Sequence, residues 1–199
     1  MIERLVTLCT GHVRVLEALV VRGGRPLPVS LPVTTAAFRH AREGWVLFDT
    51  GLAPRVRRAG RTPWRCRPAE PAAAQLRELG VPPEAVRHVI LSHLHPGCIG
   101  GLRDFPSARI HCTRRAWDAN APTTGLRRFR KAFLPTLLPT DFRARVSWLG
   151  APGGRGIGPF PATCDLFGDG AVRLVPLPGH AAGQVGAFVQ VGNTTVGKA

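Results

Sequence analysis

Tyrosine is absent from this chain of 199 residues, and lysine occurs only at Lys131 and Lys198. Arginine therefore supplies nearly all of the formal net charge of +15. Together with the many alanines, glycines and prolines, this composition is typical of a coding bias toward GC-rich codons. Because a basic excess of that origin requires no polyanionic partner, we do not expect nucleic acid to be the partner of this chain.

Long apolar runs are missing as well. No stretch approaches the roughly 20 apolar residues that a membrane span needs, so no membrane partner is expected. We expect no secretory signal, because Glu3, Arg14 and Glu17 interrupt the N-terminal apolar positions. Paired spacing is lacking among the five cysteines, which is typical of reduced thiols rather than of a disulfide framework. We therefore expect a cytoplasmic protein, and the sequence leaves its oligomeric state open.

The chain holds enough apolar residues for one sizeable core. Hydrophobic residues make up 44% of the sequence, and the mean hydropathy of +0.03 is that of a globular protein. The 23 glycines and 19 prolines indicate many turns and short strands rather than long helices. We therefore expect a single domain over residues 1–199.

Strand and helix patterns alternate in the middle of the chain and give way to strands alone near its end. The predicted strands cover residues 2–9 and 13–21 as an opening hairpin around a Thr-Gly turn, then 31–39, 45–48, 86–92, 108–112, 145–149, 165–167, 171–177, 184–191 and 194–197. The predicted helices cover residues 71–79, 99–104, 113–119 and 126–134, with Thr113 as the N-cap of the third. This order predicts an α/β sandwich.

Two histidines, His93 and His95, lie on the loop that leaves the buried strand at residues 86–92. At this spacing both imidazoles can point at one ion, and a third candidate, His180, follows another strand in a Pro-Gly-His turn. Three neutral imidazoles and a water molecule complete a tetrahedral zinc site. The alternative is that these are ordinary core or surface histidines, which is how we interpret His88 and His111 on their strands.

Four motifs taken together resemble the metallo-β-lactamase superfamily, most closely the N-acyl-homoserine lactonases and related lactone, ester and thioester hydrolases. The motifs are Phe48-Asp49-Thr50-Gly51, Val89 to His95, Gly100-Gly101-Leu102 and Pro178-Gly179-His180. The resemblance implies a sandwich of two mixed sheets flanked by helices, with metals at one edge of the sheets. It also implies that His93, His95 and His180 hold a zinc ion, and that Asp49 orients a metal-binding histidine.

The second metal site of the family pattern is degenerate here. The pattern reads His-x-His-x-Asp-His, but Gly97 and Cys98 stand at the last two positions. Lys198 stands where the family has a bridging aspartate, and the last metal-binding histidine would lie beyond Ala199. We therefore expect one ion rather than two, Cys98 as the remaining ligand at the second position, and a C-terminal part that is incomplete.

Lys198 has several possible roles beside such a site. Two unit charges about 4 Å apart interact by about 4 kcal/mol at an effective dielectric of about 20, and a dication doubles that energy. Lys198 therefore either points away, is neutral, or fills the volume of the second metal and weakens the first site. In the favourable case its ammonium replaces one charge of the missing metal and stabilises an oxyanion, which makes Lys198 a candidate catalytic residue beside Asp49.

Arginines gather in two loops that the family places near the substrate. We interpret them most simply as solvated loops of an arginine-rich chain. Their positive charge would also suit a substrate with an anionic carboxylate or a thioester carrier. The two clusters are Arg55, Arg57, Arg58, Arg61, Arg65 and Arg67, with Trp64 among them, and Arg127, Arg128, Arg130 and Lys131.

Two functional hypotheses follow, from different classes. In the first, the chain is a zinc hydrolase that attacks a lactone, ester or thioester carbonyl, with activity impaired by the loss of the second metal site. In the second, it is a non-catalytic degenerate paralogue or a truncated gene product that acts, if at all, as a binding module. A third hypothesis, nucleic-acid binding, predicts an affinity that falls steeply with salt.

Overall fold

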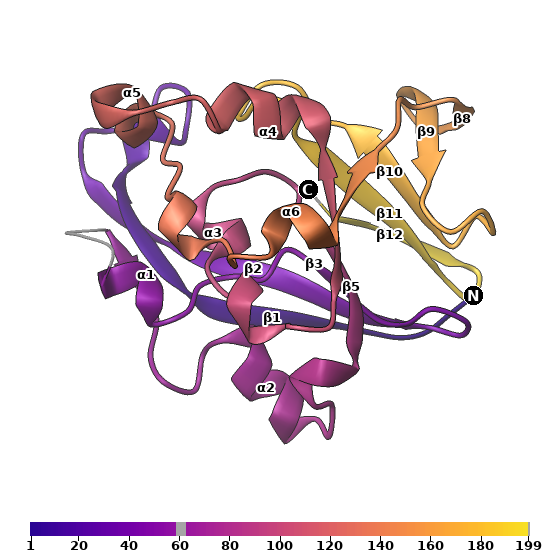
Figure 1. Ribbon diagram of the computed structural model, residues 1–199. Coiled ribbons are helices and arrows are strands. Elements are labelled where there is room, and N and C mark those ends of the chain that lie inside the picture. Colours follow the sequence, from indigo (N-terminus) through magenta and orange to yellow (C-terminus); the bar gives the residue numbers. More distant parts are fainter. Residues whose placement is uncertain (59–62, 199) are drawn as a thin grey trace.

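The computed structural model of the chain is shown in Figure 1, and it describes residues 1–58 and 63–198. Residues 1–149 supply the strands β1 (Ile2–Leu16), β2 (Pro28–His40), β3 (Gly44–Phe48), β4 (Trp64–Arg65), β5 (Val86–Ile90), β6 (Arg109–Thr113) and β7 (Val146–Leu149). The residues that follow supply β8 (Gly154–Ile157), β9 (Phe160–Asp165), β10 (Val172–Pro176), β11 (Val185–Val191) and β12 (Thr194–Lys198). The helices are α1 (Arg55–Arg58), α2 (Ala72–Glu78), α3 (Pro96–Ile99), α4 (Arg114–Asn120), α5 (Gly125–Arg130) and α6 (Phe142–Arg145).

The strands form two halves that meet along β1. Their order is β7-β6-β5-β3-β2-β1-β11-β10-β9-β8, with β12 beside β11 and β4 beside β1. The β3, β5, β6 and β7 strands run parallel, whereas β1 to β3 and β9 to β12 pair antiparallel. Within residues 1–58 and 63–198, strand pairing between the two halves is limited to one residue pair, Ile2 of β1 with Val191 of β11. Because the contact is so short, the halves fold over one another and pack face to face.

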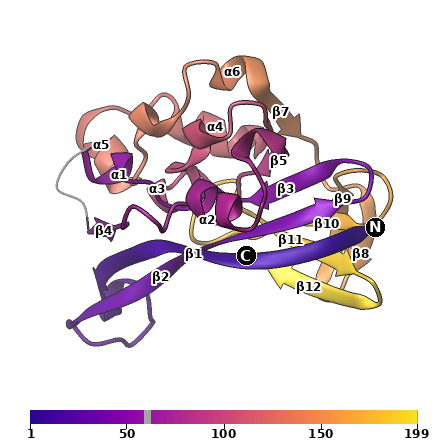
Figure 2. The same cartoon turned by 90° about the horizontal axis from the view of Figure 1, so that it is seen from below.

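Successive side chains of β3 and β5 point to opposite faces of the sheet, and this alternation divides the apolar interior into two layers. Val46, Phe48 and Ile90 face the second half of the sheet and pack against side chains of β10 and β11. Leu47 and Val89 face the other way and pack against α2, α3, α4 and α6. Figure 2 shows this arrangement from below, with the helices on one side of β3 and with β10 to β12 on the other. Both faces of the parallel strands are thus buried, as expected for α/β proteins.

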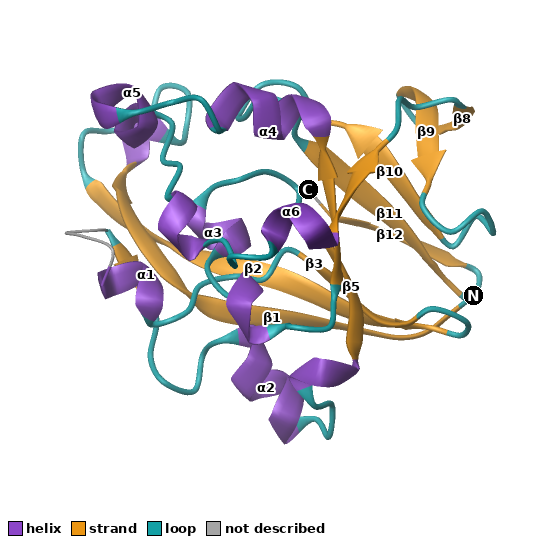
Figure 3. Cartoon of the chain, viewed as in Figure 1, coloured by secondary structure: helices purple, strands orange, loops and turns teal. Residues whose placement is uncertain are grey.

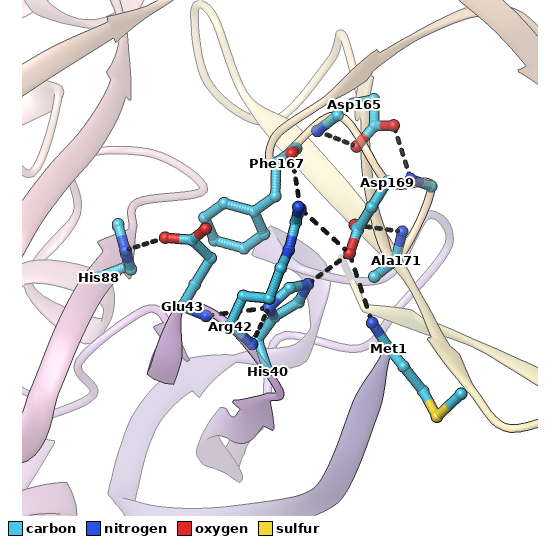
Figure 4. A network of polar contacts seen from close by, with 11 residues as sticks. Met1, His40, Arg42, Glu43, His88, Asp165, Phe167, Asp169 and Ala171 are labelled. Atoms are coloured by element: carbon cyan, nitrogen blue, oxygen red, sulfur yellow. Dashed lines mark hydrogen bonds and ion pairs between the residues drawn. The ribbon is translucent and has the colours of Figure 1, made fainter.

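A polar clamp also ties the two halves together (Figure 4). His40 is completely buried, and its Nδ1 accepts hydrogen bonds from the backbone amides of Arg42 and Glu43. Because Nδ1 is the acceptor, Nε2 is the nitrogen that donates to the Asp169 carboxylate, at 2.9 Å. Asp169 belongs to the turn between β9 and β10, so this bond fixes the end of β2 to the second half.

The predicted α/β class is confirmed, and the predicted helices near residues 71–79 and 113–119 occur as α2 and α4. The prediction of an opening hairpin is wrong. Residues 2–16 form one strand, β1, which pairs with β2 along its length and contains a bulge between Cys9 and His12. Gly11, which we interpreted as a turn residue, lies in that bulge with φ of 129°. A Cβ there would lie 2.2 Å from the carbonyl oxygen of Arg65, so the glycine lets β4 approach β1.

Candidate metal centre

Three imidazole rings meet at one edge of the sandwich. One ring nitrogen from each of His93, His95 and His180 lies within 4.8 Å of the other two, close enough for the three to share a metal ion. The ring centroids are 4.5 to 4.9 Å apart and the rings are nearly perpendicular. His180 Nε2 lies 3.1 Å from His95 Nδ1. Two distant segments of the chain therefore supply one three-nitrogen cluster, and it is the one cluster of this kind in residues 1–58 and 63–198.

Hydrogen bonds connect the His93 loop with the turn that carries His180. Where β11 begins, the amide of Val185 donates to the carbonyl of Ser92, one residue before His93, at 3.0 Å. The Thr113 hydroxyl donates to the carbonyl of Gly183 at 2.7 Å and accepts from the amide of Ala116 as the N-cap of α4. The Pro-Gly-His turn is thus attached both to the His93 loop and to the first turn of α4.

The Asp49 loop supports the cluster from behind. Asp49 has a positive φ of 61° and is 5% exposed. Its carboxylate accepts hydrogen bonds from the Ser92 amide at 2.8 Å and the Ser92 hydroxyl at 2.7 Å. The Ser92 hydroxyl lies 2.9 Å from His93 Nδ1. Because the hydroxyl proton goes to Asp49, Ser92 Oγ accepts from Nδ1–H, which leaves His93 Nε2 unprotonated and free to bind a metal.

The Asp49 loop packs against Gly100 and Gly101, the two glycines that follow the His93 loop. Gly101 donates its amide to the carbonyl of Gly51, and a Cβ on Gly101 would lie 2.5 Å from the carbonyl oxygen of Thr50. Thr50 in turn donates its hydroxyl to the carbonyl of Cys98 at 2.7 Å. The glycines therefore allow the Asp49 loop and the His93 loop to pack backbone to backbone.

Cys98 lies directly behind the His93 ring. Its Sγ is 3.6 Å from His93 Nδ1 and 3.5 Å from the Ser92 hydroxyl. Burial, together with the neighbouring Asp49 carboxylate, raises the pKa of the Cys98 thiol well above its ordinary value. Without a metal the thiol is therefore protonated at neutral pH.

Lys198 points toward this region rather than away from it. Its ammonium donates to the Thr34 hydroxyl at 3.0 Å. Burial raises the pKa of the Asp49 carboxyl to about 6, while the hydrogen bonds from Ser92 and then the charge of Lys198 act to lower it. Lys198 is thus a cation whose charge acts on both Asp49 and Cys98. A Cβ at Gly97 would lie 3.3 Å from Val33 and 3.6 Å from Trp64, so that position leaves little space for a side chain.

The two histidines of the loop are neutral at physiological pH. Burial lowers the pKa of His93 to about 3, helped by the charges of His95 and His180. Burial and His180 lower the pKa of His95 to about 4, against a backbone hydrogen bond with Lys131 that acts to raise it. Neutral imidazole is the form that binds metal ions.

The structure brings together five of the predicted site residues, Asp49, His93, His95, Cys98 and His180. The sixth, Lys198, donates to Thr34, and its charge acts on Asp49 and Cys98. The structure also reveals two residues that sequence reasoning missed as parts of the site. Ser92 links Asp49 to His93, and Thr113 anchors the turn that carries His180. The only signal for Ser92 was its place beside the first histidine, whereas Thr113 was predicted only as a helix cap.

The arginine loops contribute less to the site. Arg55 forms an ion pair with Asp104 and donates to the carbonyl of Gly100, so it stabilises the loop packing. Arg61 lies outside the described residues. Every helix in the described part of the chain is too short or too polar to cross a lipid bilayer.

An α/β sandwich with three converging histidines at its edge defines a class of metal-binding folds. The family model "Metallo-beta-lactamase superfamily" matches residues 31–194, and the chain belongs to this superfamily. A "Probable metallo-hydrolase" of Mycobacterium tuberculosis is 32% identical over 77% of the chain and 51% of its own length. An "N-acyl homoserine lactonase" of Azorhizobium caulinodans is 27% identical over 84% of the chain and 63% of its own length.

Solved structures share the fold. A mutant of AiiA from B. thuringiensis, with N-decanoyl-L-homoserine bound at its active site, superposes with a TM-score of 0.76 at 18% identity. The match covers 98% of this chain and 73% of that one. The dizinc quorum-quenching lactonase AidC has a TM-score of 0.67 at 15% identity, over 97% of this chain and 69% of that one. The chain spans about half the length of the mycobacterial relative.

Proposed function

We propose that this chain is a zinc-dependent hydrolase of small lactones, esters or thioesters, with a single ion held by His93, His95 and His180. The observation that carries the proposal is the convergence of three imidazole nitrogens within 4.8 Å of one another. The donor set fits zinc, because two of the rings are held neutral by burial and three imidazoles leave a fourth position open.

When bound, zinc lowers the pKa of a coordinated water to about 7 and polarises a carbonyl. The protein side chains supply the rest. The Asp49–Ser92 pair holds the proton of His93 on Nδ1 and so presents Nε2. The Lys198 ammonium, whose charge acts on both Asp49 and Cys98, would stabilise negative charge that develops on a substrate oxygen.

The activity is weaker than that of a two-metal enzyme under this proposal. No carboxylate occupies the position of Gly97, and the positive charge of Lys198 opposes a second cation near Asp49. We therefore propose one ion per chain and a degenerate second site, with Cys98 as a protonated neighbour rather than a full ligand. The five free cysteines support a reducing, cytoplasmic location.

The same observations favour a second candidate, a metal-binding protein without hydrolytic activity. A screen of purified, zinc-loaded protein against lactone, ester and thioester substrates separates the two. The hydrolase proposal predicts turnover that disappears in His180→Ala, and Arg77→Ala on the far α2 helix serves as the matched control. Zinc binding without turnover on any substrate class would support the second candidate.

A further inference from the structure

Large apolar side chains are exposed mainly at one projection of the molecule. The loop between β1 and β2 and the adjoining strand ends form a hairpin tip, residues 14–31, in which Leu19 is 76% exposed. Six large apolar residues of this tip are at least one-third exposed: Leu16, Leu19, Val20, Val21, Leu27 and Leu31. Most other apolar residues of that size are buried in the two core layers, so this concentration calls for a partner.

A second apolar projection lies at the same end of the molecule. Leu126 on α5 is 73% exposed and has the exposed Arg127 and Arg130 as neighbours. Figures 1 and 2 both place α5 and the hairpin tip at the left, and Figure 3 shows β8 and β9 at the opposite end. Two separated apolar tips on one side suit a broad surface better than a narrow pocket.

The positive charge of this end of the molecule indicates what kind of partner surface it would bind. Arg14, Arg22 and Arg25 are exposed on the hairpin tip, and Glu17, which pairs with Arg25 at 3.3 Å, is its only acidic residue. Residues 121–131 around α5 contain no acidic residue. Two copies of this end would repel one another, whereas an anionic lipid surface offers both the opposite charge and an apolar layer.

We propose that the hairpin tip and α5 dock together on the anionic phospholipids of a membrane surface. The apolar tips enter the headgroup layer, and the arginines contact lipid phosphates. This departs from our expectation of no membrane partner, which considered only spanning segments. The histidine cluster lies between the two tips, because His95 contacts the backbone of Lys131 just after α5, and Gly97 adjoins Val33 of β2.

Co-sedimentation with vesicles tests the proposal. We expect the full chain to bind vesicles of equal parts phosphatidylcholine and phosphatidylglycerol, and not vesicles of phosphatidylcholine alone. Leu19→Asp/Val20→Asp and, separately, Arg22→Glu should each lower the partition coefficient about tenfold. Leu79→Asp and Arg77→Glu, matched exposed substitutions at α2, should bind as the wild type does. His180→Ala should also bind normally, so this result is independent of the proposed hydrolase activity.

Three outcomes would overturn the proposal. The first is equal binding to both kinds of vesicle, or to neither. The second is loss of binding in Arg22→Glu while Leu19→Asp/Val20→Asp still binds normally, because charge alone would then explain the binding. The third is a dimer, seen by light scattering without vesicles, that the Leu19→Asp/Val20→Asp variant abolishes, because the tip would then contact a second copy. Circular dichroism of each variant confirms that it is folded before the comparison is made.

Discussion

At the scale of single residues, the candidate site depends on which atoms carry protons. Asp49 does not touch a histidine ring; it acts through the Ser92 hydroxyl, which lies 2.7 Å from the carboxylate and 2.9 Å from His93 Nδ1. The family resemblance predicted that Asp49 orients a metal-binding histidine, but neither the identity of that histidine nor the serine between them could be predicted. That link depends on the positive φ of Asp49, which turns its carboxylate back toward the Ser92 amide.

Replacing Ser92 by alanine should therefore weaken zinc binding without unfolding the protein. We expect the affinity for zinc to fall about 10- to 100-fold, the usual effect of losing a partner that orients a metal-binding histidine. Competition with a chromophoric chelator measures the affinity. Ser147→Ala, on β7 away from the cluster, is the control, and an unchanged affinity in Ser92→Ala would mean that the bond to His93 has no role.

A second residue-scale prediction concerns the His88–His111 pair between the two halves. The rings are hydrogen-bonded at 3.0 Å, with Glu43 at 3.5 Å from His88 and Arg109 nearby. Burial lowers the pKa of His111 to about 4, assisted by the charges of His88 and Arg109. Between pH 4 and 6.5 the unfolded chain therefore binds more protons at this site than the folded chain does, and stability rises with pH.

The free energy of unfolding should consequently fall as the pH is lowered from 7 to 5. His111→Phe, which cannot titrate, should lose about 1–2 kcal/mol less stability over that interval than the wild type. Urea denaturation at the two pH values measures the difference. Zinc-free protein is used so that pH-dependent metal binding does not enter, and the contribution of the lowered pKa values of His93 and His95 is the same in both proteins. Identical losses in the two proteins would show that the pKa of His111 is not lowered in the fold.

At the scale of elements, hydrophobic periodicity predicted most of the fold, and contacts between distant segments decided the rest. The buried β3 and β5 strands and the α2 and α4 helices carry their own patterns and caps. β8, which contains two glycines in four residues, has no such pattern, and it was missed. The prediction of an opening hairpin failed because Thr10-Gly11 is typical of a turn. Here a glycine is required at position 11 because β4, which is remote in sequence, approaches β1 closely.

The N-cap of α4 also anchors the turn that carries His180, so one substitution tests both roles. Thr113→Ala should destabilise the protein by about 1 kcal/mol and weaken zinc binding, because Gly183 loses its hydrogen bond. Thr113→Ser keeps the hydroxyl and should restore both. Thermal melting and zinc titration measure the two effects; a zinc affinity equal to that of the wild type in Thr113→Ala would contradict the anchoring role.

At the scale of the whole molecule, the two halves bring the ligands together. His93 and His95 follow β5 of the first half, and His180 precedes β11 of the second, so the cluster exists only when the halves pack. The two halves contact one another through the Ile2–Val191 strand pair, the apolar layer that contains Val46, Phe48 and Ile90, and the hydrogen bond from His40 to Asp169. The three histidines could be singled out from the sequence, first by their positions after predicted strands and then by family resemblance, but their distance from one another is a property of this packing.

The most direct test of the account is the zinc content of the purified protein, measured by elemental analysis after dialysis against zinc at neutral pH. The account predicts about one zinc ion per chain in the wild type, and a loss of that zinc in His93→Ala, His95→Ala and His180→Ala. Cys98→Ala should retain it. A wild-type protein without zinc, or a His180→Ala variant with unchanged zinc content, would contradict the central claim that three imidazoles from two segments share one ion.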